Sequence, residues 1–148
     1  MTLEFGKNED IEPWMKLVQA VRTNFPGLET LESINEHKCT VLKCMKDQRA
    51  ICIKDLENIV GVLLVSKNHN IISFLAVLPE YRKQGIASKL LSTALENLDR
   101  TKNITVSTFR ESDPKGIAPR ELYKKFGFVE AELIEEFGYP NQRFILYP

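Results

Sequence analysis

The segment from Ile71 to Leu91 constrains the fold of this chain more than any other. It opens with Ile-Ile-Ser-Phe-Leu-Ala-Val-Leu over 71–78, a run that is apolar at both alternating sets of positions. A strand of this kind needs cover on both faces, which predicts the centre of a sheet. Pro79 ends the strand, and a helix starts near Gly85 with apolar residues at helical spacing. The segment therefore predicts a central strand, a short turn and an amphipathic helix.

The rest of the chain predicts a mixed α+β domain. An early helix is expected after Asp10 as N-cap and before the stop at Asn24-Phe25-Pro26-Gly27, and Thr30 is expected to cap a second. Polar turns between the apolar runs of 50–78 favour an antiparallel meander. A short helix over Arg120–Phe126 is expected to end at Gly127, a good left-handed cap. The expected strands are 3–5, 50–53, 59–65, 71–78, 104–109, 129–133 and 143–147, the last two joined across Gly138-Tyr139-Pro140-Asn141.

Length and charge restrict the function. The 148 residues fit one domain spanning 1–148, and 20 basic residues balance 20 acidic ones. A chain with no net charge is a poor candidate for nucleic-acid binding, which depends on a basic face. No signal peptide is recognisable, and no apolar run is long enough for a membrane span. We expect a cytoplasmic protein that binds neither nucleic acid nor membrane.

The cysteines indicate neither a disulfide framework nor a metal centre. There are three of them, no Cys-x-x-Cys pair occurs, and only two histidines could add ligands. The expectation is therefore reduced, mostly buried thiols and no metal. The residues concerned are Cys39, Cys44, Cys52, His37 and His69.

The start of the helix near Gly85 is a candidate anion site. The first N–H groups of a helix lack intrahelical partners, and the helix dipole makes that end partly positive. Gly85 and Ala87 would let a diphosphate approach the backbone, and Arg82 and Lys83 could add charge. The alternative is a tight turn into an ordinary helix with exposed basic residues. Neither Gly-x-x-x-x-Gly-Lys-Ser/Thr nor Gly-x-Gly-x-x-Gly is present.

Two motifs carry a resemblance to a known family. Arg82-x-x-Gly85-x-Ala87, after a strand that ends in Val-x-Pro, resembles the Arg/Gln-x-x-Gly-x-Gly/Ala signature of the GNAT superfamily of N-acetyltransferases. Glu121-Leu-Tyr-Lys-Lys-Phe-Gly-Phe128 resembles the second motif of that family, Leu-Tyr-x-x-x-Gly-Phe. The order of expected elements also fits, so the resemblance covers essentially the whole chain. It implies a mixed central sheet of about six or seven strands flanked by about four helices.

The resemblance also implies a reaction and its residues. Acetyl-CoA would be the co-substrate, and a primary amine would attack its thioester directly. The central strand would splay from its neighbour, with the backbone of Leu75 and Val77 binding the pantetheine and an N–H near Val77 stabilising the oxyanion. Tyr123 would be the general acid toward the leaving thiolate; its alternative role is core packing. The pyrophosphate would be bound by Arg82, Lys83, Gln84, Gly85, Ile86, Ala87 and Ser88.

Several features leave alternatives open. Many family members have Asn seven residues before the tyrosine, where this chain has Gly116, which puts one cofactor contact in doubt. The general base could be Glu111, Glu80 or a chain of waters. The acceptor could be a small-molecule amine or a peptide amine, and a homodimer is possible. A domain of the same fold that only senses acyl-CoA is the alternative function.

Residues near the C-terminus also have two readings each. Phe137, Tyr139 and Phe144 could line an acceptor pocket or fill the core. The acidic residues of the same region could attract a cationic amine or form a solvated strand face. These are Glu130, Glu132, Glu135 and Glu136.

Overall fold

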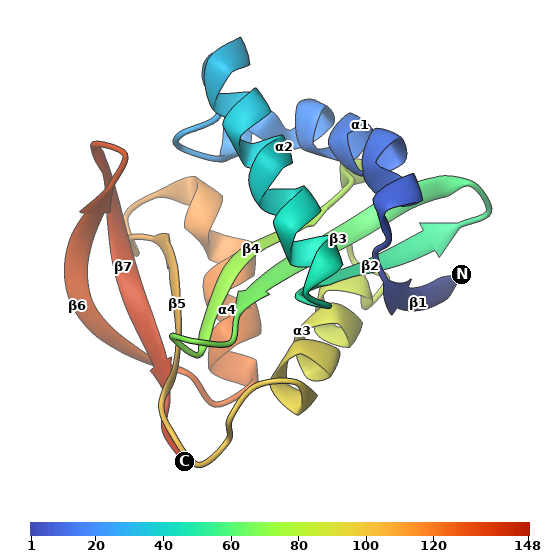
Figure 1. Ribbon diagram of the computed structural model, residues 1–148. Helices are drawn as coiled ribbons and strands as arrows, with labels where there is room; N and C mark the ends of the chain where they lie inside the picture. The colour runs from blue at the N-terminus through green and yellow to red at the C-terminus, as the bar shows by residue number, and fades with distance from the viewer.

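A computed structural model describes all residues, 1–148, and shows one seven-stranded sheet in the order β1-β2-β3-β4-β5-β7-β6 (Figure 1). The strands are β1 (Thr2–Phe5), β2 (Ala50–Asp55), β3 (Asn58–Ser66), β4 (Ile71–Val77), β5 (Ile104–Phe109), β6 (Val129–Glu136) and β7 (Tyr139–Leu146). The helices are α1 (Ile11–Val21), α2 (Leu31–Lys46), α3 (Ile86–Glu96) and α4 (Ile117–Lys125). The expected α+β fold with four helices is confirmed.

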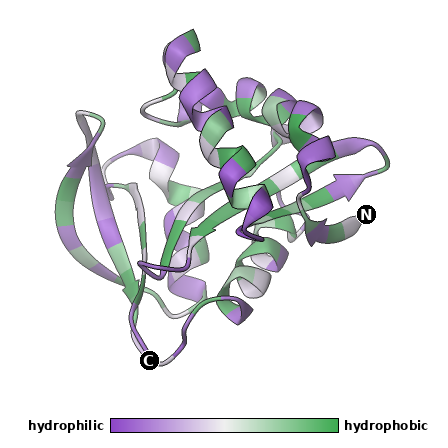
Figure 2. Cartoon of the chain, viewed as in Figure 1, coloured by the Kyte–Doolittle hydropathy of each residue, from purple (hydrophilic) through white to green (hydrophobic).

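Helices cover both faces of this sheet and bury two apolar clusters. One cluster lies between the sheet and the helices α3 and α4, and includes Leu90, Val106 and Phe144. The other lies between the sheet and α1 and α2, and includes Trp14 and Val62. Apolar residues concentrate along β3 and β4, whereas the hairpin of β6 and β7 mixes polar and apolar residues (Figure 2). No helix is both long enough and apolar enough to span a membrane.

The position of β4 agrees with the sequence pattern. It is the fourth of seven strands, and β2, β3 and β4 form the expected antiparallel meander. Consecutive buried residues alternate between the clusters, with Phe74 and Ala76 toward α1 and α2 and Leu75 toward α3. Both faces of β4 are therefore covered, as the run of apolar residues predicts.

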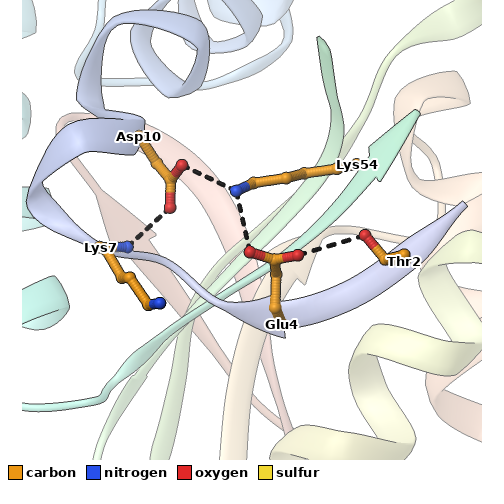
Figure 3. Close-up of polar contacts among 5 residues, drawn as sticks. All are labelled: Thr2, Glu4, Lys7, Asp10 and Lys54. Atoms are coloured by element: carbon orange, nitrogen blue, oxygen red, sulfur yellow. Dashed lines mark hydrogen bonds and ion pairs between the residues drawn. The ribbon is translucent and has the colours of Figure 1, made fainter. Parts of the chain in front are cut away.

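The predicted cap at Thr30 is confirmed, but the one at Asp10 is wrong. Thr30 Oγ1 accepts a hydrogen bond from the Ser33 backbone N–H at 3.0 Å. The Asp10 carboxylate makes no capping bond to α1. It accepts instead from the Lys7 backbone N–H at 2.8 Å and pairs with Lys54 of β2 at 2.8 Å (Figure 3). Lys54, which is distant in sequence, binds the Asp10 carboxylate that the local capping pattern assigns to the first turn of α1.

The C-terminal region differs from the sequence prediction in three ways. Helix α4 begins at Ile117, three residues before the predicted start, because Pro119 lies in its first turn, where no backbone donor is needed. The turn of the last hairpin is Phe137-Gly138, with φ of 53° and 74°. Two positive φ values in a two-residue loop are typical of a type I′ turn. Strand β7 therefore starts at Tyr139, within the residues predicted as the turn.

Strand β6 also lacks the predicted half-buried face. It is the edge of the sheet, and its register shifts between Glu130 and Leu133. Val129 and Leu133 remain 48% and 61% exposed. The alternation of apolar and acidic residues is interrupted by this bulge, so the apolar positions do not all face the core.

Candidate functional site

The central feature of the candidate site is a gap between β4 and β5. The two strands are parallel neighbours, but they pair only at Ile71 with Thr105 and at Ile72 with Val106. Strand β4 continues to Val77 and β5 to Phe109 without further pairing with each other. The register of β4 against β3 shifts where Ser73 is inserted, at the point where the splay begins.

The backbone of β4 beyond this point has one unpaired edge. The N–H of Leu78 donates to the Val60 carbonyl of β3 at 2.9 Å. In an antiparallel pair, successive residues of one strand direct their N–H and C=O groups alternately toward the partner and away from it. Counting back from Leu78, Leu75 and Val77 therefore direct these groups away from β3, into the gap that β5 leaves.

The turn after β4 leads into α3 through a left-handed backbone. Lys83 has φ of 62° and Gly85, the N-cap of α3, has φ of 79°. The first helical bond joins the Lys89 N–H to the Gly85 carbonyl, so the N–H groups of Ile86, Ala87 and Ser88 precede the hydrogen-bonded ladder. No side chain caps them. A Cβ at Gly85 would meet nothing within 4 Å, so the space in front of this turn is open.

The structure brings the predicted anion-binding residues onto one turn. Arg82, Lys83 and Gln84 are exposed, and neither basic side chain is in an ion pair within the chain. Tyr81, just before them, donates its hydroxyl to Asp55 Oδ2 at 2.8 Å, which ties the turn to the β2–β3 connection. The turn is thus anchored behind a surface with two free cations and an uncapped helix.

Tyr123 is part of the core. Only 4% of it is exposed, and its ring lies 5.7 Å from that of Phe128 and 6.1 Å from that of Phe144. Leu75 and Val77 of β4 pack against the same apolar cluster. Burial raises the pKa of its hydroxyl, and no hydrogen bond within the chain contributes. Tyr123 is therefore neutral at physiological pH.

Packing explains why position 116, where many family members have asparagine, holds a glycine in this chain. A Cβ there would lie 3.1 Å from the Arg110 carbonyl, from Cδ of Arg120 and from Cβ of Phe109. Arg120 is buried and donates to the Phe109 carbonyl at 3.0 Å and to Gln142 Oε1 at 2.8 Å. The buried arginine fills the space that a side chain at 116 would need, and it ties α4 to the end of β5.

A cavity of about 320 Å³ lies between the α1–α2 connection and the start of β7. Its walls contact both splayed strands. The ring of Phe25 lies 4.4 Å from that of Phe74 on β4, and the ring of Tyr139 lies 5.7 Å from that of Phe109 on β5. The residues that line it are Arg22, Thr23, Phe25, Pro26, Leu28, Glu29, Lys115 and Tyr139.

Hydrogen bonds fix the acidic groups at this cavity. Both carboxylate oxygens of Glu29 accept from the Gly27 N–H at 3.0 Å, and this bond is the first cause of the lowered pKa of Glu29. Tyr139 donates its hydroxyl to Asp113 Oδ2 at 2.6 Å, and Oδ1 accepts from the Lys115 N–H at 3.0 Å. These two bonds, and then the Lys115 ammonium, lower the pKa of Asp113. Both carboxylates are ionised at neutral pH and already bonded.

The aromatic and acidic residues near the C-terminus lie in different environments. Tyr139 lines the cavity, Phe144 is fully buried in the core, and Phe137 is exposed with its ring against Gly27. Glu130 pairs with Arg120 and Lys124, so it is neutralised by neighbours. Glu132 pairs with Arg143 at 2.7 Å. Half of the acidic cluster is thus bound in salt bridges of the hairpin and its neighbouring helix.

The candidate general bases are not drawn into the cavity. Glu80 lies after β4 and Glu111 after β5, both exposed and neither among the cavity residues. The sequence had given no reason to select Arg22, Thr23, Glu29 or Lys115. They belong to connections that only the tertiary fold brings together, and no local pattern marks them.

No curated protein sequence matches. An acetyltransferase from Bacillus cereus, of the GNAT family, has a TM-score of 0.75 at 21% identity over 99% of this chain and 96% of its own. Ribosomal-protein-alanine N-acetyltransferase from Brucella melitensis has a TM-score of 0.76 at 14% identity over 98% of each chain. PaiA N-acetyltransferase from Thermoplasma acidophilum, in complex with coenzyme A, has a TM-score of 0.68 at 15% identity over 97% of this chain and 98% of its own.

The family profile described as acetyltransferase (GNAT) domain matches residues 46–130, more than half of the chain. This range begins at the end of α2 and runs through the splayed strands, the turn into α3 and the helix that carries Tyr123. It thus contains both sequence motifs and the whole candidate cofactor edge. This chain belongs to the GNAT acetyltransferase family.

Proposed function

We propose that the protein is a cytoplasmic N-acetyltransferase that transfers the acetyl group of acetyl-CoA to a primary amine. The observation that carries the proposal is the unpaired edge of β4 directly before an open, uncapped helix N-terminus. Unpaired backbone groups need partners, and the amides of pantetheine are suitable ones. The unpaired thiols of the chain suit a reducing compartment.

The residues present fit acetyl-CoA as co-substrate. Backbone groups of Leu75 and Val77 would bind the pantetheine arm in the gap between β4 and β5. The backbone from Arg82 to Ala87, with Ser88 in the first turn of α3, would hold the pyrophosphate, which a helix N-terminus favours. Arg82 and Lys83 are free to pair with the same anion, and Gln84 and Ile86 would contribute N–H groups.

The chemistry is direct transfer. The amine nitrogen attacks the thioester carbonyl, a C–N bond forms, and the C–S bond then breaks. The amine loses one proton, and the thiolate gains one to leave as free coenzyme A. A backbone N–H of the unpaired β4 edge, at Val77, would stabilise the oxyanion between these steps.

Tyr123 would protonate the leaving thiolate. Its raised pKa keeps the hydroxyl protonated, and the absence of a hydrogen bond within the chain leaves that proton free. Neither β4 nor β5 contains a carboxylate, which favours a water chain over Glu111 or Glu80 as the route by which the amine loses its proton. The amine would enter from the cavity beside Phe25 and Tyr139, because these walls contact both strands of the gap.

Cofactor binding is tested by thermal shift with acetyl-CoA, CoA, ATP and NAD. At about one hundred times Kd, a bound ligand stabilises the fold by about 2.7 kcal/mol. For a chain of this size that is a rise in Tm of several degrees. Acetyl-CoA and CoA should raise Tm while ATP and NAD should not. If neither acetyl-CoA nor CoA raises Tm, the proposal is refuted.

A matched pair of variants locates the site. Gly85→Glu places a carboxylate in the proposed pyrophosphate site and should abolish the shift. Gly138→Glu is the control, because Gly138 has φ of 74° against 79° for Gly85, and a Cβ at either position meets nothing within 4 Å. The control should suffer the same backbone strain but retain acetyl-CoA binding. Equal binding by both folded variants would place the cofactor elsewhere.

An acyl-CoA sensor without transfer remains the second candidate, favoured by the packing of Tyr123 in the core. Tyr123→Phe distinguishes the two. For the enzyme, kcat should fall at least about tenfold while acetyl-CoA affinity changes little, since a positioned acid contributes at least that much. For the sensor, there is no thiol release with any amine, although acetyl-CoA binds. An unchanged kcat would remove Tyr123 from the mechanism.

A further inference from the structure

The charges at the 320 Å³ cavity define a class of acceptor, provided that the proposed transfer takes place there. We infer that the acceptor is a small amine that also carries a carboxylate, and that Arg22 and Lys115 bind this carboxylate. The inference rests on three observations: which charges at the cavity are unpaired, which are already bonded, and how large the cavity is.

The cations at the cavity have no ion-pair partner. Arg22 and Lys115 both line it, and neither takes part in any ion pair of the chain. The Lys115 ammonium lies 5.9 Å from the centre of the Tyr139 ring, on the cavity wall. A guanidinium is planar and binds a carboxylate through two parallel hydrogen bonds, and an ammonium adds a third donor.

The carboxylates at and beside the cavity, in contrast, already accept hydrogen bonds within the chain. Glu29, the one carboxylate that lines the cavity, has both oxygens on the Gly27 N–H. Asp113 has one oxygen on the Tyr139 hydroxyl and the other on the Lys115 N–H. The acidic residues Glu130 and Glu132 are paired on the hairpin and its helix. Hydrogen bonds from neutral donors leave Glu29 and Asp113 charged, so two cations and two carboxylates lie at or beside the cavity, which favours an acceptor with both a cationic and an anionic group over a polyamine.

The size of the cavity limits the acceptor further. A volume of about 320 Å³ is at the small end of ligand sites. Phe25 and Tyr139 form aromatic walls that contact β4 and β5, and an apolar side chain of the acceptor would pack against them. With the carboxylate held at Arg22 and Lys115, the amine would point toward the gap between β4 and β5. The structure thus fits an amino-acid-sized acceptor.

Matched amines test this inference. Acetyl transfer is measured by thiol release with L-lysine against cadaverine and L-phenylalanine against phenethylamine, since each pair differs only in the carboxylate. In at least one pair, the wild-type protein should have at least about tenfold higher kcat/KM for the amine that carries the carboxylate, because a charge-assisted hydrogen bond contributes about that much. Arg22→Gln or Lys115→Gln should reduce this preference about tenfold and leave the decarboxylated amines nearly unchanged. Lys43→Gln, an exposed lysine that does not line this cavity, is the control for net charge.

A second readout does not depend on turnover. The Tm of CoA-saturated protein should rise with N-acetyl-L-phenylalanine but not with N-acetylphenethylamine, and Arg22→Gln should remove the rise. Equal or better transfer to the decarboxylated amines, or a preference that survives in both glutamine variants, would overturn the inference. If acetyl-CoA binds but no carboxylate-bearing amine is acetylated, the acceptor class is wrong while the cofactor site stands. If acetyl-CoA does not bind, the proposed function fails, and the acceptor site fails with it.

Discussion

An alanine at Gly61 would test how tightly the start of α3 is held against the sheet. Gly61 lies on β3 opposite Val77 of β4, under the first residue of α3. A Cβ at this position would lie 2.6 Å from Cγ2 of Ile86 and 3.0 Å from Cδ1 of Leu90. Ordinary carbon contacts are about 3.5–4.0 Å, so the helix would have to move by roughly 1 Å. Gly61→Ala should therefore displace the proposed pyrophosphate-binding turn.

The expected cost follows from this overlap. Inserting one methyl group into a well-packed core costs about 1–3 kcal/mol. The entropy gain of replacing glycine recovers at most about 1 kcal/mol of this. The free energy of unfolding should fall by about 1–2 kcal/mol, which lowers Tm by roughly 3–8 °C in a chain of this size. The misplaced N–H groups should raise the Kd for acetyl-CoA by at least roughly tenfold, since a misplacement of about 1 Å can cost up to about a hundredfold.

Urea unfolding and thermal-shift titration with acetyl-CoA measure both effects. The partner variant is Ile86→Ala, which removes the methyl group that Gly61→Ala would strike. The double variant should lose less stability than the sum of the single ones, because the added and removed atoms compensate. A Gly61→Ala protein with unchanged Tm and unchanged acetyl-CoA affinity would show that α3 moves freely on the sheet. Strict additivity with Ile86→Ala would show that the overlap with Ile86 is not the cause.

Three further predictions concern packing and charge. Gly116→Asn, which restores the residue common in the family, should destabilise the fold by about 1–3 kcal/mol in urea unfolding, because its Cβ meets Arg120 and the end of β5 at 3.1 Å; unchanged stability would show that Arg120 repacks freely. Burial lowers the pKa of His37, so the unfolded chain takes up this proton first as the pH falls. Stability should decrease from pH 7 to pH 5, and His37→Gln should make that decrease smaller; an equal decrease in the variant would assign it to other groups. Lys54 bonds both Glu4, at 2.9 Å, and the buried Asp10, at 2.8 Å, so Lys54→Met should cost about 1–3 kcal/mol in urea unfolding. Glu4→Gln removes only the exposed partner and should cost less than about 1 kcal/mol; equal costs would contradict the importance of Asp10.

The elements that sequence predicts well are those defined by adjacent residues. The apolar run of β4, the helix after Gly85 and the cap at Thr30 depend on spacing of one to four residues. Gly127 likewise has φ of 95°, and the Phe128 N–H returns to the Tyr123 carbonyl at 3.0 Å, as the predicted left-handed cap requires. Backbone geometry within a few residues determines these features, so short stretches of sequence are enough to predict them.

The errors occur where a distant residue changes the outcome. Asp10 is a good N-cap by local rules, but Lys54 lies close enough to compete for its carboxylate. Burial alone would raise the pKa of Asp10, yet the bonds from Lys54 and the Lys7 N–H lower it. The last hairpin turns at Phe137-Gly138, although Pro140 and Asn141 have stronger turn propensity. Pairing of Asn141 with Phe109 of β5 and of Tyr139 with Glu136 of β6 determines where β7 starts, and no local signal encodes that pairing.

The same distinction separates the two halves of the candidate site. The cofactor edge uses backbone groups of one continuous segment, from Leu75 through Ser88, so a short motif with one glycine is enough to mark it. The cavity proposed for the acceptor combines Arg22 and Glu29 of the α1–α2 connection with Lys115, just before α4, and Tyr139, the first residue of β7. Under the proposal, its specificity lies in side chains that the shared backbone does not determine. The similarity to solved structures at 14–21% identity shows the fold and does not show the acceptor. The charges at the cavity are consequently better evidence for the acceptor than the family match is.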